Sequence, residues 1–373
     1  PDVSHLQYHI NAAVPYNVWH YYQSTGDIDF LLSHGAEIIL SNALFWSDKA
    51  TLNEKMGKYE IKKVMGPDEY HTHYPGAAED EPGLNNNAYT NVMAVWVIER
   101  ALELLELLDN EWRKNLRQTV GFSEIDIDRW KKITKNMYVP FKDDLIMQFD
   151  GYDKLKELDW DYYHREYGQF IRLDRVLEAE GDSCNNYKAS KQADVLMLFY
   201  LFSAEELDGI FNNLGYTLKP GTIPENIDYY SRHTAHGSTL SQVIYAWVFA
   251  RSNRDESWKS FRKALLSDFK DVQGGTTHEG IHLGAMAGTL DIIQRCYTGL
   301  EIRDDVLWFN PQLPEDIRQM RFYLRYRGHW IHLDINHKTL TITFDKGWAN
   351  PVTIGVNGTT YLFETNDKKI FQL

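Results

Sequence analysis

The sequence has 373 residues, 43% of them hydrophobic, so it is long enough to bury a large core and to divide into more than one domain. Its 39 basic and 53 acidic residues give a net charge of −14, which repels a phosphate backbone, so we expect no nucleic-acid partner. The sequence shows no uncharged apolar run of about 18 residues and no signal segment, and it therefore predicts a cytoplasmic protein with no membrane partner. Cys184 and Cys296 are too few for a disulfide framework, and we expect reduced thiols.

Helical spacing dominates the first part of the chain. Apolar residues recur at intervals of three and four between residues 6 and 50, which predicts two helices joined by the turn STGD. A long irregular stretch over 51–84 follows, and helical spacing returns over 87–108 and more weakly over 123–137. Residues 138–186 are rich in Tyr, Asp and Gly, and we expect a second long loop there.

The middle of the chain continues with helices in pairs. Residues 188–202 pair with 203–216, residues 241–252 pair with 255–268, and a last helix is predicted from about Glu279 to Tyr297. Short turns between helices favour antiparallel neighbours, so the repeated pairs predict a toroid of helical hairpins. The long loops would then line a cleft on one rim.

The pattern changes near residue 305. Beyond it, short segments alternate between apolar and polar residues and are separated by NHK, DKGW and NGT, which is typical of antiparallel strands. The sequence therefore predicts two domains, a helical domain over 1–304 and a small antiparallel β-sandwich over 305–373.

The segment VMGPDEYHTH (64–73) is the first candidate site. Gly66-Pro67 predicts a turn, so the adjacent carboxylates of Asp68 and Glu69 lie on a loop. Two neighbouring carboxyl groups with different environments can supply a protonated general acid at neutral pH. The alternative is a solvated acidic turn.

The segment HTAHGSTLSQVIYAW (233–247) is the second candidate. Thr239 and Gln242 have the spacing of a capping box, so a helix is predicted to begin there with free backbone N–H groups at its tip. With Ser238 and His236 beside it, such a tip suits a phosphate. The alternative is an N-cap with only a structural role.

The segment QGGTTHEGIHLGAMAGT (273–289) allows two interpretations. As H-E-x-x-H, it would place His278 and His282 on zinc with Glu279 as base, and Glu301 lies at the spacing of a third ligand. Alternatively, Thr276 and Glu279 form a capping box in a glycine loop that opens a helix. In that case this loop and the tip near 236–242 could form one anion pocket.

These segments together resemble glycoside hydrolase family 65. GPDEYH, NNNAYTN (85–91), KQADVL (191–196), HGSTLS (236–241) and GGTTHEGIHLGAMAGT (274–289) match the signature stretches of that family in order, over nearly the whole chain. The resemblance implies a mainly α fold, an (α/α)6 barrel that is incomplete at its N-terminal side, followed by a small β-sandwich. It also implies that an N-terminal β-sandwich and the first barrel helices, with a Trp-Asp pair for the cleaved glucose, would precede Pro1.

The resemblance assigns roles to individual residues. It implies Glu69 as general acid, with Asp68 and Tyr70 positioning it or the sugar, and it implies substrate binding by Lys191 and Gln192. It also implies substrate binding by Glu279. The phosphate-binding residues that it implies are His236, Ser238, Thr239, Gly275 and Thr276.

The implied reaction is inverting phosphorolysis of an α-linked glucose disaccharide of the trehalose, kojibiose or maltose type. Phosphate would be a co-substrate, no cofactor or metal is expected, and a homodimer is the expected assembly. The alternative is an inverting α-glucoside hydrolase, which needs a second carboxylate as base. Glu225 and Glu279 are the acids near the relevant loops, and neither is a compelling base, which favours phosphorolysis. A zinc peptidase through His278 and His282 remains the most distant alternative.

Overall fold

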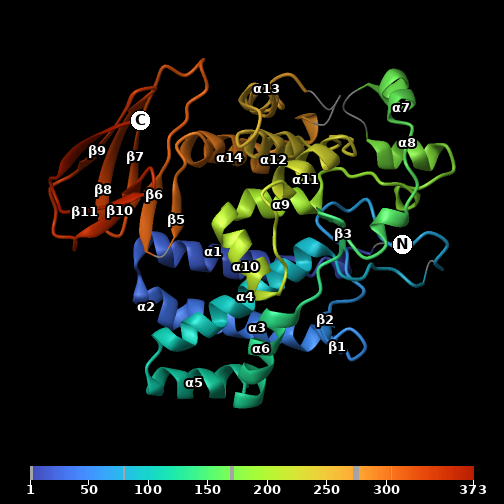
Figure 1. Cartoon of the computed structure of the whole chain (residues 1–373), viewed down its shortest axis with the longest axis horizontal. Coiled ribbons are helices and arrows are strands. Elements are labelled where there is room, and N and C mark those ends of the chain that lie inside the picture. The colour runs from blue at the N-terminus through green and yellow to red at the C-terminus, as the bar shows by residue number, and fades with distance from the viewer. Residues whose placement is uncertain (1–2, 79, 169–171, 272–276, 304) are drawn as a thin grey trace.

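The structure is a computed structural model that describes residues 3–78, 80–168, 172–271, 277–303 and 305–373. It is mostly helical, with two small sheets at the C-terminal end of the chain (Figure 1). The α-helices are α1 (Ile10–Thr25), α2 (Ile28–Phe30), α3 (Ala36–Lys49), α4 (Ala88–Leu107), α5 (Asn110–Val120), α6 (Glu124–Asn136), α7 (Trp160–Tyr167), α8 (Leu173–Ala179), α9 (Asp194–Leu201), α10 (Ala204–Asn213), α11 (Thr222–Ser231), α12 (Thr239–Phe249), α13 (Arg254–Leu265) and α14 (Leu283–Asp291).

The first two predicted helices are confirmed. Helix α1 ends at Gly26, whose left-handed φ of 68° closes the helix, and a second helical run extends from Ile28 to Lys49. Within the described residues, this run alone is long and apolar enough to cross a membrane by length and composition. A core helix passes the same test, and in this structure Ile39, Ala43 and Trp46 are buried on a helix that packs against α4.

Four helices lie where the sequence predicts none. Helices α7 and α8 occupy part of the predicted loop 138–186, and α5 and α11 lie between predicted elements. Helix α5 is capped by Asp109 and is mostly polar, and its apolar side is limited to the buried Leu116 and its neighbours Trp112 and Val120. Helix α14 also begins later than predicted, at Leu283, because Gly280 with φ of 140° interrupts the chain before it.

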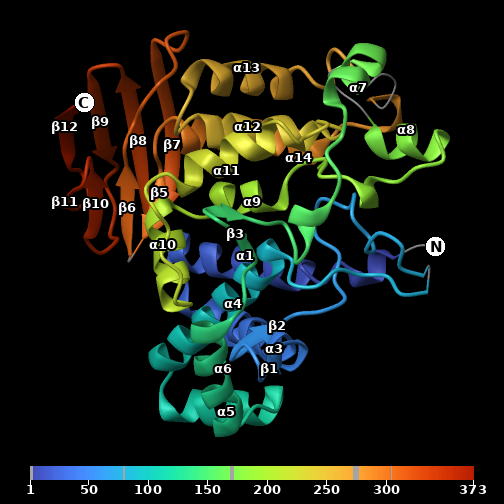
Figure 2. The same cartoon turned by 45° about the vertical axis from the view of Figure 1, so that its right-hand side comes forward.

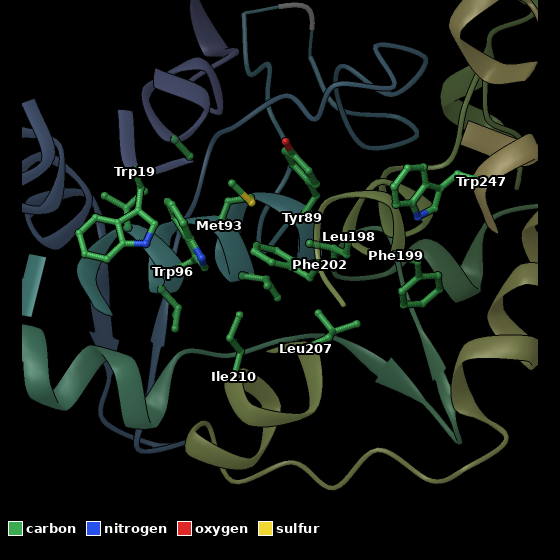
Figure 3. Close-up of a cluster of buried hydrophobic side chains, with 14 of the residues drawn as sticks. Trp19, Tyr89, Met93, Trp96, Leu198, Phe199, Phe202, Leu207, Ile210 and Trp247 are labelled. Carbon is green, nitrogen blue, oxygen red and sulfur yellow. The ribbon is translucent and has the colours of Figure 1, made fainter. Parts of the chain in front are cut away.

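The helices surround a common apolar core. Helix α4 packs against α1, α3 and α9, and α12 packs against α9, α13 and α14. Figure 3 shows the centre of this core, where Trp96 of α4 and Phe202 approach within 6.3 Å between ring centroids. Since these helices contribute both the core and the loops at their ends, the core fixes the positions of those loops.

The C-terminal strands form two four-stranded sheets. One sheet has the order β11-β10-β6-β5 and the other β12-β9-β8-β7. The strands are β5 (Glu301–Arg303), β6 (Val306–Phe309), β7 (Gln319–Tyr326), β8 (His329–Asn336), β9 (Thr339–Phe344), β10 (Val352–Val356), β11 (Thr359–Phe363) and β12 (Lys368–Gln372). The rings of Phe344 and Phe363 stack 4.8 Å apart and join the two sheets. Pairing in these sheets is antiparallel, as predicted, except between β6 and β10, which are parallel.

Candidate active site

Two sequence motifs are joined by reciprocal hydrogen bonds. The buried Asp68 carboxylate accepts the backbone N–H groups of Lys191 and Gln192 at 2.6 and 3.0 Å through the same oxygen. In return, the Asp194 carboxylate accepts the backbone N–H of Asp68 at 2.7 Å. The GPDEYH loop and the KQADVL segment, which lie more than 120 residues apart in sequence, are therefore held in a fixed register.

Asp194 is a positioning residue that the sequence does not reveal. Its second oxygen accepts the side-chain amide of Asn87 at 2.7 Å, and burial together with the neighbouring Asp68 carboxylate holds the pKa of Asp194 well above its ordinary value. A Cβ at Gly66 would lie 2.0 Å from the Asp194 carboxylate and 2.5 Å from the Asn87 amide. Gly66 is therefore required because the backbone approaches this pair closely.

Glu69 is the carboxylate that this loop presents outward. Its side chain is 47% exposed, and its two oxygens accept hydrogen bonds from Lys191 Nζ at 2.9 Å and Gln7 Nε2 at 2.7 Å. Its φ of 65° is left-handed, a costly conformation for a residue with a Cβ and one that is found at functional sites.

The electrostatics of Glu69 differ from those of a ready general acid. Burial raises its pKa, but the hydrogen bonds and charge of Lys191, together with Gln7 and His9, outweigh burial and leave the pKa below its ordinary value. The sequence predicts one ionised and one protonated carboxyl on this loop. In the structure, Glu69 is the half-exposed, ion-paired member, and Asp68 is the buried one.

The other predicted substrate residues lie at different depths. Lys191 touches Glu69 directly, whereas Gln192 is buried and its Oε1 has no hydrogen-bond partner. Tyr70 is packed in a second apolar cluster with Leu173 and Leu177, its hydroxyl has no partner, and burial raises its pKa. The structure therefore brings Lys191 to the acid and places the Tyr70 ring in a core.

The tip of α12 lies beside the same segment. Ser190 donates its backbone N–H to the His233 carbonyl and accepts the N–H of Ala235, both at 2.8 Å, so residues 233–235 run alongside Lys191. Ser238 is the N-cap and its hydroxyl accepts the N–H of Leu240 at 3.2 Å. The predicted capping box of Thr239 and Gln242 is wrong, because Thr239 is already the first helical residue.

His236 stands at this tip in a strained and cation-rich setting. Its φ is 51°, and its Nδ1 lies 2.7 Å from the hydroxyl of Ser241. Burial, together with the charges of Lys263 on α13 and His164 on α7, lowers the pKa of His236 to about 4. Lys263 and His164 are not identified from the sequence, since their nearness to His236 depends on helix packing.

The third motif is only partly described. Gly275 and Thr276 lie outside the described residues, and Glu279 closes a short 3-10 turn (Thr277–Glu279) without a described side chain. His282 lies beyond that turn, as the N-cap of α14, and its ring pairs with Asp268 at 2.5 Å. His278 and His282 are therefore not on one helix, as the zinc-peptidase arrangement requires. In the described part of the chain, no group of three His, Cys, Asp or Glu residues is arranged to hold a metal.

A large cavity lies away from these groups. It has a volume of about 710 Å³ and is lined by residues that include Tyr16, Trp247, Arg251 and Tyr326. Trp247 is nine residues from the Ser238 cap, so this cavity lies toward the opposite end of α12 from the tip, about 14 Å away at about 1.5 Å per residue. It is therefore distinct from the surroundings of Glu69.

Comparison with known proteins identifies the family. Residues 1–291 match the glycosyl hydrolase family 65 central catalytic domain, and residues 300–363 match the family 65 C-terminal domain. The chain belongs to glycoside hydrolase family 65. Glycoside hydrolase family 65 is a family of enzymes, and its members include phosphorylases.

Several relatives align over nearly the whole chain. An uncharacterized glycosyl hydrolase from Mycobacterium tuberculosis is 51% identical over 96% of this chain and 27% of its own length. A trehalose 6-phosphate phosphorylase from Lactococcus lactis is 36% identical over 92% of this chain and 43% of its own length, and a kojibiose phosphorylase from Halothermothrix orenii is 30% identical over 97% and 44%. The chain thus spans less than half the length of these relatives. A solved structure of a putative kojibiose phosphorylase from the human microbiome aligns with 98% of this chain and over 50% of its own length. The TM-score is 0.80 at 22% identity, which shows a shared fold.

Proposed function

We propose that this chain carries the catalytic machinery of an inverting phosphorylase that cleaves an α-linked glucose disaccharide to β-glucose 1-phosphate and a sugar. The observation that carries the proposal is the junction at Ser190–Lys191, where the segment that holds Glu69 also runs alongside the tip of α12. An acid and an anion-binding helix tip on one segment are the two groups that this reaction requires.

The proposed framework is part of an (α/α)6 barrel. Helices α1, α4, α9, α12 and α14 follow one another as inner helices, since each of the successive pairs is in contact. Helices α3, α6, α10 and α13 would form the outer layer against them. Figure 2 shows the GPDEYH loop region and the α12 tip on the side of the helical body away from the sheets.

Glu69 would protonate the glycosidic oxygen while phosphate attacks C1 from the opposite face. One phosphate oxygen forms the new bond to C1, the bond from C1 to the glycosidic oxygen breaks, and the departing sugar takes the proton of Glu69. The hydrogen bond and charge of Lys191 lower the pKa of Glu69, whereas a general acid has to carry a proton, so the proposal requires the substrate to weaken this ion pair. We propose that glucose hydroxyls accept hydrogen bonds from Lys191 in place of Glu69, which raises the pKa of Glu69 in the complex. Another glucose hydroxyl would donate to the unpartnered Oε1 of Gln192.

Phosphate would bind at the α12 tip. The first backbone N–H groups of α12, the Ser238 hydroxyl and the positive charge near His236 favour an anion there. Because phosphate is itself a nucleophile, no second carboxylate is needed.

Hydrolysis is the competing reaction, and it needs a base for water. Glu225 lies near the start of α11. His233, just past the end of that helix, accepts the backbone N–H of Ser190 through its carbonyl. Eight residues of helix separate the two by about 12 Å, so Glu225 lies toward the other end of α11 from the Glu69 side. This placement argues against Glu225 as the base for water; the side chain of Glu279, the other candidate, is not described in the structure.

The test is product formation from trehalose, kojibiose, maltose and trehalose 6-phosphate, each with and without inorganic phosphate. The last is included because one relative acts on it. β-Glucose 1-phosphate formed only with phosphate would support the proposal, and equal glucose release without phosphate would show a hydrolase. Glu69→Gln should abolish turnover and leave the circular dichroism spectrum unchanged.

A further inference from the structure

The Glu69 carboxylate is held between two donors that come from distant parts of the chain. Lys191 Nζ donates to its Oε2 at 2.9 Å, and the side-chain amide of Gln7 donates to its Oε1 at 2.7 Å. Each carboxylate oxygen therefore has a hydrogen-bond partner of its own. The two partners differ in charge, because Lys191 carries an ammonium group and Gln7 carries a neutral amide.

The position of Gln7 is set by the backbone around it. Gln7 follows the short 3-10 turn Ser4–Leu6 and donates its backbone N–H to the Ser4 carbonyl at 3.0 Å. The carbonyl of Leu6, whose side chain is buried, accepts the backbone N–H of Met65 at 3.0 Å. Since Met65 directly precedes the GPDEYH loop, the segment that carries Gln7 is tied by its backbone to the loop that carries the acid.

The two contacts respond differently when Glu69 gains a proton. The attraction between Lys191 and Glu69 depends on the negative charge of the carboxylate, and it is lost with that charge. An amide N–H, in contrast, can still donate to the carbonyl oxygen of a neutral carboxylic acid. Gln7 therefore keeps its partner in the protonated state that a general acid needs, whereas the Lys191 contact weakens.

The Gln7 contact also distinguishes the two oxygens of Glu69. A proton on Oε1 would face the Gln7 amide N–H, so two donors would meet and the hydrogen bond would be lost. A proton on Oε2 leaves Oε1 as the carbonyl oxygen, which accepts from Gln7 as before. The geometry therefore favours protonation on Oε2, the oxygen that Lys191 contacts in the structure.

Two other titratable groups lie near Glu69. Burial lowers the pKa of His9, although the charge of Glu69 acts in the opposite direction, so the imidazole is neutral at neutral pH. The Asp194 carboxyl is buried, and both of its oxygens already accept hydrogen bonds. In the part of the chain that the structure describes, the hydrogen bonds to the Glu69 carboxylate come from Gln7 and Lys191.

We propose that Gln7 is a positioning residue of the reaction, whose amide holds Oε1 of Glu69 as the carbonyl oxygen so that Oε2 carries the proton for the glycosidic oxygen. This inference rests on the function proposed above. Solvent supplies the proton to Oε2 once the substrate has engaged Lys191. The proton then passes to the glycosidic oxygen while the bond from C1 to that oxygen breaks and a phosphate oxygen bonds to C1, which leaves Glu69 as a carboxylate.

The test compares two substrates that differ in their need for an acid. The sugar of a disaccharide leaves as an alkoxide unless it is protonated, whereas fluoride leaves from α-glucosyl fluoride with little help from an acid. Gln7→Met keeps the length of the side chain and removes the donor. We expect it to lower kcat/KM for the disaccharide by about tenfold, a part of the roughly 10²–10⁴-fold that general acid catalysis contributes, and to leave α-glucosyl fluoride turnover near the wild-type level.

A second variant separates a donor from an acceptor at this position. Gln7→Glu exchanges the amide for a carboxylate of nearly the same shape, which would draw the proton of Glu69 to Oε1. Disaccharide turnover should therefore fall at least as far as in Gln7→Met. The matched control is Gln118→Met, which alters an exposed glutamine on α5 and should behave like the wild type with both substrates.

A measurement that does not depend on turnover follows the Glu69 carboxyl directly. Burial raises the pKa of Glu69, and Lys191 and Gln7 lower it, so Gln7→Met should raise it. The pKa is measured by NMR titration of protein labelled at its glutamate carboxyl carbons, in which the Glu69 signal is identified by its absence from Glu69→Gln. An unchanged pKa in Gln7→Met would overturn the inference.

The kinetic outcomes separate this inference from the proposed function. Disaccharide turnover at the wild-type level in Gln7→Met or Gln7→Glu would overturn the role of Gln7 alone. An equal loss with the disaccharide and with α-glucosyl fluoride would show a structural role and would also overturn it. A wild-type protein that cleaves neither substrate, with or without phosphate, would overturn the proposed function and this inference with it.

Discussion

Replacing Asp68 by alanine should release the loop that holds Glu69. One Asp68 oxygen accepts two backbone N–H groups, at 2.6 and 3.0 Å, and the side chain is only 4% exposed, so water cannot replace it freely. Each hydrogen bond to a charged group is worth about 1.5–3 kcal/mol, so the loss is bounded at about 3–6 kcal/mol. Because the loop can relax, we expect Asp68→Ala to lower the free energy of unfolding by about 3 kcal/mol. Asp68→Asn keeps one acceptor oxygen and should cost about 1–2 kcal/mol.

Two measurements check this expectation. Urea unfolding gives the stability change, and hydrogen exchange should show lost protection at the amides of Lys191 and Gln192 in Asp68→Ala but mostly retained protection in Asp68→Asn. Turnover should fall in the same order because Lys191 and Glu69 lose their register. The control is Asp128→Ala, which removes a 70% exposed carboxylate from a surface pair with Lys131 and should change stability by less than about 0.5 kcal/mol. Wild-type protection of both amides in Asp68→Ala would refute the reasoning.

Three further predictions concern the same region. Lys191→Met should raise the pKa of Glu69, since Lys191 lowers it, and the basic limb of the pH profile of kcat/KM should move to higher pH; an unmoved limb would argue against the ion pair in solution. His236 has a folded pKa of about 4, below its unfolded value of 6.5, so it contributes stability above pH 6.5 that is lost as pH falls toward 4. A sulfate bound beside His236 favours the protonated imidazole, and the charge of sulfate itself is constant in this range. Sulfate should therefore raise the Tm more at pH 5.5 than at pH 8, and His236→Gln should remove most of that difference. An equal difference in the variant would place the anion elsewhere. Gly66→Ala should cost about 1–3 kcal/mol and reduce turnover at least tenfold, because the new Cβ would collide with Asp194; thermal unfolding and activity at the wild-type level would show that the loop shifts freely.

Helices that are rich in apolar residues could be predicted from the sequence. The pairs around 188–216 and 241–268 are found as α9 with α10 and α12 with α13. Helices α5, α7, α8 and α11 could not, because they are short or mostly polar and their stability depends on caps and neighbours. The start of α14 at Leu283 likewise depends on a backbone conformation at Gly280 that the capping-box pattern does not predict.

What the sequence by itself determined is the family and the mainly helical class with terminal strands, because short contiguous motifs and local periodicity carry both. The same motifs supply Glu69 and Lys191, the residues proposed for the chemistry. Only the tertiary structure decided which residues support them. Gln7 and Asp194 reach the GPDEYH loop from 62 and 126 residues away, and such pairings leave no local periodicity to recognise. The same holds for the electrostatics. Whether Asp68 or Glu69 is buried depends on the packing of the core helices, because desolvation and a partner charge are properties of the folded surroundings and not of the residue type.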